Sequence, residues 1–560
     1  MLFPNLKNFW LNIKRDKILV GILAFGLILR GLNPTFGSPS LYVSNDEAVA
    51  HLAALNMLAA KTPVSIANYT PLGAYVQIPF LAASYGAMRI FGSIGNLGDF
   101  RLFILTHGGY FLFISRLMSA MFGTLMILVI YKLTRLLFGI KSVGLIAAFF
   151  CAVSFNLVHI SHFGRPWAGA LFFFLLAFYK TLKNKTFFPY ILTGLSYGFH
   201  QVGIFALPFL IFFLKKSTLK KNLVGIFIAA ILVFIFSLLT LKVGIIKSIE
   251  NEQSFLKPHT IIVDFLAEKL NINSFVSTLK LNSAKYYLVN LFFTDGILLV
   301  FGIWGMVKAA RSKTSSRILI IYIFCYFLFA SFFFYPLLRY LLPAIMLLIP
   351  FAAFGVYSIF NRRTFFIILL LAIASINSLW WNWLYLKTPT FIQAASWVNK
   401  HIPESVPIAY NGGRFQVFAP SKPAIAQMQK FSPKSYKELQ TILPNTEIDN
   451  VRNIVYLDKI KVSGKFEQVK EVWQNYQVKY MIDYYLDPVD SLIDSHPGNF
   501  YLITRFNPDI KNRMTGIAEP LFDATSNFDS FEIRKNLSMY SLTRIGPYFD
   551  ILGIKDLSQK

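Results

Sequence analysis

Two adjacent carboxylates, Asp46 and Glu47, are the residues of this sequence whose type and setting best suit chemistry. The first 249 residues contain only two other acidic residues, Asp16 and Asp99, and are otherwise dominated by long apolar runs. Charged side chains in such a setting are costly unless they are paired or functional. A carboxylate can accept the proton of an attacking hydroxyl group, so the pair is a candidate for general-base catalysis.

A structural role for the same pair also fits the sequence. Ser44 and Glu47 have the spacing of a capping box, with Ser44 as the N-cap and Glu47 as the third residue of a helix. Asp46 is then a first-turn acid, which the helix dipole favours. The two roles are compatible, because a capped helix holds a carboxylate rigidly. The pattern makes Glu47 largely architectural and leaves Asp46 for chemistry.

Composition places the chain in a membrane. It has 560 residues, 55% of them hydrophobic, and apolar runs of the length that a bilayer core requires. The net charge is +27, of which residues 386–560 carry only +3. The positive excess therefore lies beside the apolar runs, where lysine and arginine fix topology. No basic, aromatic-rich soluble patch is present, which argues against nucleic-acid binding.

The alternation of basic clusters and apolar runs predicts an N-terminus in the cytoplasm and about 11 spans. The C-terminus then lies outside the cell membrane. Residues 71–93 are predicted to form a helix that lies along or dips into the outer face, rather than a span. The segments 187–199 and 202–214 are short for a full crossing.

We therefore predict a mainly α, polytopic membrane protein with outer-face amphipathic helices and a C-terminal extracytoplasmic α/β domain. The membrane domain covers residues 1–385 and includes a first extracytoplasmic loop at 34–110; the α/β domain covers 386–560. In that domain the patterns predict helices at 394–401, 435–442 and 466–476 and strands at 406–410, 453–457 and 478–484.

This topology gathers polar residues on the outer face. Besides the acidic pair they are Tyr69, His159, His162, Arg165, His200, Arg339 and Tyr340. Histidines in such positions are more often hydrogen-bonded interfacial residues than metal ligands. An arginine there, or at Arg116, is also consistent with simple snorkelling to the interface.

Four ordered stretches of the chain resemble the GT-C-type integral membrane glycosyltransferases, in the branch of the protein O-mannosyltransferases and the lipid A aminoarabinose transferase. They are 45–47, 69–75, 115–166 and 339–343, within about residues 18–400. Two departures are visible. Thr70 replaces the first proline of the family's His-Pro-Pro-Leu run, and the second outer turn lacks the acid that many relatives carry there. The second departure disfavours a metal site built from two carboxylates.

The resemblance implies transfer of a sugar from a polyprenyl-phosphate donor to a hydroxyl group of a lipid, glycan or protein acceptor at the outer face, with inversion. It implies that Asp46 is the general base, that Glu47 positions it, and that Arg339 with Arg165 holds the donor phosphate. Substrate contacts are expected from Tyr69, His162, His200 and Tyr340. A divalent metal cofactor is left open.

Two other classes of function remain in view at this point. A transporter or flippase of lipid-linked saccharides would also have many spans and intramembrane arginines, but polar residues through both halves of the bilayer and internal repeats are typical of that class. A non-catalytic envelope assembly protein would use the membrane part as a scaffold. The one-sided placement of the polar residues favours the transferase.

Overall fold

The computed structural model describes residues 16–38, 40, 47, 50, 51, 53, 54, 57, 70–183, 187–212, 219–249, 281–311, 314–333, 337–360, 363–411, 417–432, 443, 451–458, 474–485, 491–496, 499–507 and 548–554. Asp46 and Tyr69 lie outside the described residues. So do Ser44 of the predicted capping box and the predicted helix at 435–442.

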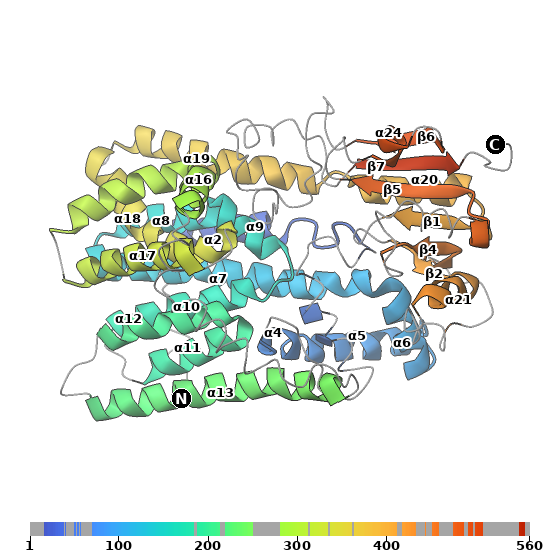
Figure 1. Cartoon of the computed structure of the whole chain (residues 1–560). Coiled ribbons are helices and arrows are strands. Elements are labelled where there is room, and N and C mark those ends of the chain that lie inside the picture. Colours follow the sequence, from blue (N-terminus) through green and yellow to red (C-terminus); the bar gives the residue numbers. More distant parts are fainter. Residues whose placement is uncertain are drawn as a thin grey trace.

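Helices form most of the structure and pack side by side, with a small sheet at one end (Figure 1). In the first part of the chain they are α2 (Lys17–Gly31), α4 (Leu72–Tyr75), α5 (Ile78–Ile90), α6 (Leu97–His107), η1 (Gly108–Phe111), α7 (Leu112–Phe138), α8 (Lys141–Val153) and α9 (Phe155–His162). Then come α10 (Trp167–Leu182), α11 (Phe188–Phe199), η2 (Gln201–Phe205), α12 (Ala206–Phe212) and α13 (Leu219–Ile249). The last group is α16 (Leu281–Ala309), α17 (Thr314–Phe333), η4 (Leu338–Leu341), α18 (Leu342–Phe360), α19 (Thr364–Tyr385) and α20 (Thr390–His401).

The chain is a multi-pass membrane protein. Among the described residues, 5 helical segments are long and apolar enough to cross a bilayer, and α8 with α9, bent by 50° at their junction, brings the number up to 6. The predicted number of eleven spans is not confirmed by this measure, because several apolar helices, such as α10, are shorter than a full span. The predicted non-spanning segment 71–93 contains the two short helices α4 and α5.

Close backbone contact joins α16 to α18 in the middle of the helical part. A Cβ atom on Gly355 would meet the carbonyl oxygen of Phe301, and one on Gly305 would meet that of Phe351. Small residues let helices approach in this way where lipid removes the usual hydrophobic driving force. Helix α16 also contains one residue with non-helical backbone, Asp295.

The C-terminal sheet has five strands in the order β4-β1-β5-β7-β6. They are β1 (Ile408–Asn411), β4 (Ile454–Tyr456), β5 (Tyr480–Tyr485), β6 (Phe500–Phe506) and β7 (Tyr548–Ile554). The first three are parallel, whereas β7 runs antiparallel to both of its neighbours. Two further short strands, β2 (Ala419–Pro420) and β3 (Val451–Arg452), pair in parallel, and α21 (Lys422–Phe431) and α24 (Leu492–Ser495) complete the region.

The predicted strands at 406–410, 453–457 and 478–484 correspond to β1, β4 and β5, and the predicted helix at 394–401 lies within α20. The sequence prediction of an α/β region is therefore confirmed. It missed β6, β7 and α21. Helix α20 continues from α19 and packs on β6 and β7, so the sheet is joined to the end of the last long helix (Figure 1).

A polar cluster is buried where β5 pairs with β7. Asp550 accepts two hydrogen bonds of 2.7 Å from Arg505, while Asp483, its partner in the register, accepts from Asn411 at 2.9 Å and from the Leu492 N–H at 2.8 Å. Asp483 has no cation of its own in these contacts. Burial raises the pKa of Asp483 to about 7, although the hydrogen bonds from Leu492 and Asn411 act in the opposite direction.

The stability of the sheet should therefore fall as the pH rises from the ordinary carboxyl pKa of 3.8 to about 7. In this window the folded Asp483 still holds a proton that the unfolded chain has lost, so raising the pH favours unfolding. We expect the protection of the β5 amides, measured as their hydrogen-exchange rate relative to the intrinsic rate at the same pH, to fall over the window in the wild type. It should change less in Asp483→Asn, which cannot ionise. Equal pH dependence in the two proteins would show that Asp483 does not titrate there.

Candidate functional site

Glu47 is fully buried, and both of its carboxylate oxygens accept hydrogen bonds. Arg116 of α7 donates from Nε to Oε1 at 2.6 Å and from Nη2 to Oε2 at 2.9 Å. The backbone N–H of Gly164, in the turn after α9, donates to Oε1 at 2.8 Å. Two-point arginine–carboxylate pairs are among the strongest polar contacts in proteins. Glu47 is therefore held as an anchor of its own segment.

The remaining amino group of Arg116 binds the chain ahead of that segment. Its Nη1 donates to the carbonyl oxygens of Pro34 at 3.0 Å and Phe36 at 2.5 Å. One buried guanidinium thus ties the turn after α2, the Glu47 segment and α7 together. Its side chain is 3% exposed and that of Glu47 is 0% exposed, so breaking the pair would leave a buried charge uncompensated.

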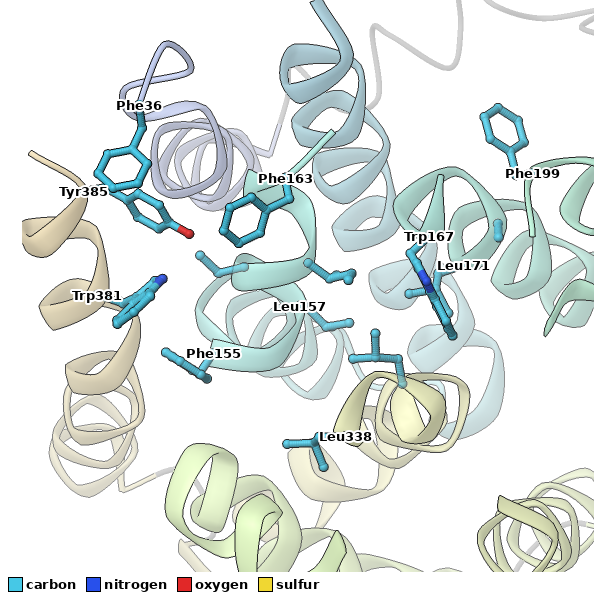
Figure 2. Close-up of a cluster of buried hydrophobic side chains, with 14 of the residues drawn as sticks. Phe36, Phe155, Leu157, Phe163, Trp167, Leu171, Phe199, Leu338, Trp381 and Tyr385 are labelled. Carbon is cyan, nitrogen blue, oxygen red and sulfur yellow. The ribbon is translucent and has the colours of Figure 1, made fainter. Parts of the chain in front are cut away.

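The turn after α2 also contacts the end of α19. Asn33 has a left-handed backbone (φ 50°), which asparagine tolerates better than most residues, and its Nδ2 donates to the carbonyl of Tyr385 at 2.6 Å. The Phe36 ring meets the Tyr385 ring edge-on at 4.9 Å. Figure 2 shows these two rings side by side, with the Tyr385 hydroxyl directed towards Phe163. Tyr385, the last residue of α19 before the chain continues to α20 and the C-terminal sheet, therefore lies at this site.

The turn from Gly164 to Trp167 is packed too tightly for a side chain at its first residue. A Cβ atom on Gly164 would collide with Ser115 of α7, so glycine is required for its N–H to reach Glu47. The next residue, Arg165, is 1% exposed, its backbone carbonyl accepts from Ser119 at 3.1 Å, and its guanidinium lies 5.6 Å from the Phe163 ring centre. A buried arginine thus follows directly in the chain on Gly164, the residue whose N–H binds Glu47.

The same turn is covered by the segment that resembles the family's proline-rich run. Thr70 donates to the Tyr197 carbonyl at 2.6 Å, and Gly73 of α4 lies against Pro166. A cavity of about 20 Å³ remains between them, lined by Gln77, Arg165 and their neighbours. The departure at Thr70 is therefore structural in this chain: its hydroxyl makes a bond that proline could not make.

A second group of predicted residues surrounds Trp167 at the start of α10. The Trp167 ring lies 4.0 Å from the ring of His200 and 5.6 Å from that of Tyr340. Arg339, which is 9% exposed, lies with its guanidinium 5.6 Å from the Tyr340 ring centre and acts electrostatically on His200. Segments more than a hundred residues apart thus bring His200, Arg339 and Tyr340 together.

His162 and His159 lie on α9, among aromatic rings. The His162 ring meets Tyr385 edge-on at 4.3 Å, its Nδ1 is 3.5 Å from the Arg30 carbonyl, and its Nε2 has no hydrogen-bond partner among the described residues. His159 packs against Trp381 at 5.8 Å. His162 thus lies beside Tyr385, at the end of α19, rather than in the group around Trp167.

The predicted residues therefore fall into two neighbouring groups joined by the turn 164–167. Glu47, Arg165 and His162 belong to one, and His200, Arg339 and Tyr340 to the other. Sequence reasoning missed Arg116, Gly164, Asn33 and Tyr385. It treated Arg116 as an interfacial arginine, because Arg30, Arg89 and Arg101 lie among the same apolar runs and no sequence pattern singles out the arginine that pairs with Glu47.

A metal is not supported by the residues that the structure describes. Among them no group of three or more histidine, cysteine, aspartate or glutamate side chains could hold an ion. Glu47, the predicted acid that is described, already receives three donors from Arg116 and Gly164. The donor set around it therefore does not fit a metal site.

Replacing Arg116 by lysine should destabilise the protein, because an ammonium group cannot reproduce the four donor contacts of the guanidinium. We expect a loss of roughly 1–3 kcal/mol, visible as a lower unfolding midpoint of the detergent-solubilised protein. Arg89→Lys is the matched control, since Arg89 is exposed and bonds Tyr85 of its own helix at 3.2 Å. Equal midpoints for the two variants would contradict the anchoring role.

Comparison with known proteins gives no sequence match: no family model and no curated protein matches this chain. Similar solved structures include the oligosaccharyltransferase of Archaeoglobus fulgidus in complex with Zn and sulfate, with 15% identity, a TM-score of 0.44, and 83% of this chain and 67% of that chain covered. They also include ArnT from Cupriavidus metallidurans without ligand, with 12% identity, a TM-score of 0.46, and 88% and 96% of the two chains covered.

The same ArnT bound to undecaprenyl phosphate is similar at 13% identity and a TM-score of 0.45, covering 87% of this chain and 96% of that one. Both proteins are glycosyltransferases of the GT-C type that the sequence resembles.

Proposed function

We propose that this chain is a membrane glycosyltransferase that moves a sugar from a polyprenyl-phosphate donor to an acceptor hydroxyl group at the extracytoplasmic face, with inversion. The observation that carries the proposal is the hydrogen bond from the Gly164 N–H to Glu47. Asp46 precedes Glu47 in the chain and Arg165 follows Gly164. The candidate base Asp46 is therefore the chain neighbour of one partner in this hydrogen bond, and the buried Arg165 is the chain neighbour of the other.

Asp46 is the proposed base. The acceptor oxygen attacks the anomeric carbon as its proton passes to Asp46, and the bond from that carbon to the phosphate oxygen breaks. The electron pair of the broken bond leaves with the lipid phosphate, which is a good leaving group and needs no strong acid. One displacement without a covalent intermediate inverts the sugar.

Glu47 supports this step from a distance. Its carboxylate is occupied by Arg116 and Gly164, so its proposed role is to hold Asp46 in place rather than to take a proton. The same division of labour follows from the capping-box pattern of the sequence. A positioning role of this kind is what a rigid site needs, because small displacements of a reacting group lower rates strongly.

Arg339 and Arg165 are the proposed cradle for the donor phosphate. Both guanidinium groups are buried, and a buried arginine attracts the charge that develops on a leaving phosphate more strongly than an exposed one does. His200 and Tyr340, which lie with Arg339 around Trp167, are proposed contacts of the donor, with His162 and Tyr69 as further proposed contacts.

The proposed orientation follows from the positive-inside rule and keeps the N-terminus in the cytoplasm. The site and the C-terminal sheet then lie outside, with residues 1–385 as the membrane domain and 386–560 as the extracytoplasmic domain. The acceptor is a hydroxyl of a lipid, glycan or protein. No step in this scheme depends on a metal.

Replacing Asp46 by asparagine should abolish transfer while the protein still inserts and folds. We expect at least a ~100-fold fall in the rate of lipid-phosphate release from a panel of polyprenyl-phosphate sugars, the size of a lost general base. The matched control is Asp99→Asn, because Asp99 is an exposed acid that accepts from the backbone of its own turn. An active Asp46→Asn protein would rule out the base, and an inactive wild type with every donor would rule out the activity.

A further inference from the structure

Helix α16 is interrupted at Asp295, deep among the other helices. The backbone of Asp295 leaves the helical region (φ −134°, ψ 41°), and its side chain is buried. The interruption faces the junction of α8 and α9, where the chain bends by 50°. Two broken helices thus meet at one carboxylate that the proposed reaction does not use.

Asp295 caps the start of α9 from another helix. Its Oδ1 accepts from the Phe155 N–H at 2.9 Å. Its Oδ2 accepts from the Ser154 hydroxyl at 2.8 Å, the Asn156 N–H at 3.2 Å and the Asn156 side-chain amide at 2.5 Å. The first N–H groups of a helix have no partners within it, and a negative charge there is favoured by the helix dipole.

Neighbouring side chains satisfy the other groups freed by the two breaks. Asn377 of α19 donates to the carbonyls of Phe293 and Thr294 at 2.9 and 2.8 Å. Ser378 donates to the Val153 carbonyl at the end of α8 at 2.7 Å. Arg30 of α2 donates to the Ala152 and Cys151 carbonyls at 2.8 and 2.6 Å. Irregular backbone at membrane depth persists only where it is satisfied in this way.

The choice of a carboxylate is the informative point. In the described part of the chain no lysine or arginine forms an ion pair with Asp295, so its carboxyl group is satisfied by donors at the start of α9. An ionisable side chain in a membrane core usually serves a function. Helix α9 is eight residues long and ends two residues before Gly164, whose N–H holds Glu47.

We propose that Asp295 is a positioning residue of the active site: it fixes the start of α9 and thereby the place of Gly164 and Arg165 at the other end. The effect on the reaction rests on the proposed function, whereas the effect on the α8–α9 junction does not. Two independent measurements therefore separate the two claims.

The first measurement uses a thiol that the chain already has. Cys151 and Cys325 are the two cysteines, the first buried one turn before the junction and the second exposed. In a Cys325→Ser background only Cys151 can react, and its chain neighbour Phe150 lines, with Val153 and Asp295, a cavity of about 420 Å³. The labelling rate then reports opening of the junction.

Asp295→Asn should raise the Cys151 labelling rate roughly tenfold or more. Asparagine replaces one accepting oxygen of the carboxyl group by an NH2 donor, so hydrogen bonds to the start of α9 are lost and two donors face each other there. Unchanged labelling would overturn the proposal. In the exchanged pair Asp295→Asn with Asn156→Asp, the carboxylate returns to the start of α9, so slow labelling should be restored at least in part. An exchanged pair as open as the single variant would also count against it.

A milder pair of variants guards against misfolding of Asp295→Asn. Ser378→Ala removes a bond from α19 to the end of α8, whereas Ser375→Ala removes a bond of 2.8 Å to Leu371 within α19 itself. We expect faster Cys151 labelling in Ser378→Ala alone. Equal labelling rates in the two variants would contradict the proposal that these hydrogen bonds hold the α8–α9 junction closed.

The second measurement is donor turnover per folded enzyme. Asp295→Asn should lower kcat by at least ~10-fold with a smaller change in KM, and the exchanged pair should recover kcat, because misplacing the Gly164 turn affects the transition state more than donor binding. Normal kcat with a labelled, open junction would refute the positioning role. If the wild type turns over no donor, the proposed function fails and labelling alone decides the role of Asp295 at the junction.

Discussion

The buried pair of Glu47 and Arg116 is the interaction on which the site depends. A single guanidinium binds a carboxylate and two backbone carbonyls, and the carboxylate binds the turn after α9. Four stretches of the chain therefore meet at one point: the turn after α2, the Glu47 segment, α7 and the turn after α9. A charge pair removed from water contributes little net stability but is costly to break from one side. The pair consequently specifies the arrangement more than it stabilises the fold.

Around this pair the structure uses broken helices to bring polar groups together inside an apolar body. Helix α9 begins at the break after α8 and ends just before the Gly164 turn, and Arg339 lies in the short helix η4. Each break exposes backbone groups that lipid cannot satisfy, so each requires polar side chains nearby. Asp295 and Arg30 meet that need at the α8–α9 junction, and Asn377 meets it at the break in α16. Polar residues far from the proposed chemistry are thus explained by the geometry that the chemistry needs.

Much of this could be predicted from the sequence. Apolar runs and basic clusters predicted a helical membrane protein, and alternating patterns located β1, β4 and β5. The edge strand β6 and its neighbour β7 were missed, although the run Phe500–Phe506 is rich in the aromatic and β-branched residues that are typical of strands. In the site, the residue types at 46, 47, 165 and 339 attract attention by their rarity, whereas the pairing of Glu47 with Arg116 spans 69 residues and is visible only after folding.

The stereochemistry of transfer tests the central claim most directly. If Arg116 occupies Glu47, only one carboxylate of the pair is left to act, and a retaining double displacement, which uses one carboxylate as nucleophile and a second as acid and base, would lack one of the two. The anomeric configuration of the product, measured by NMR against a donor of defined configuration, should therefore be opposite to that of the donor. Retained configuration, or no transferred sugar from any donor in the panel, would contradict the account.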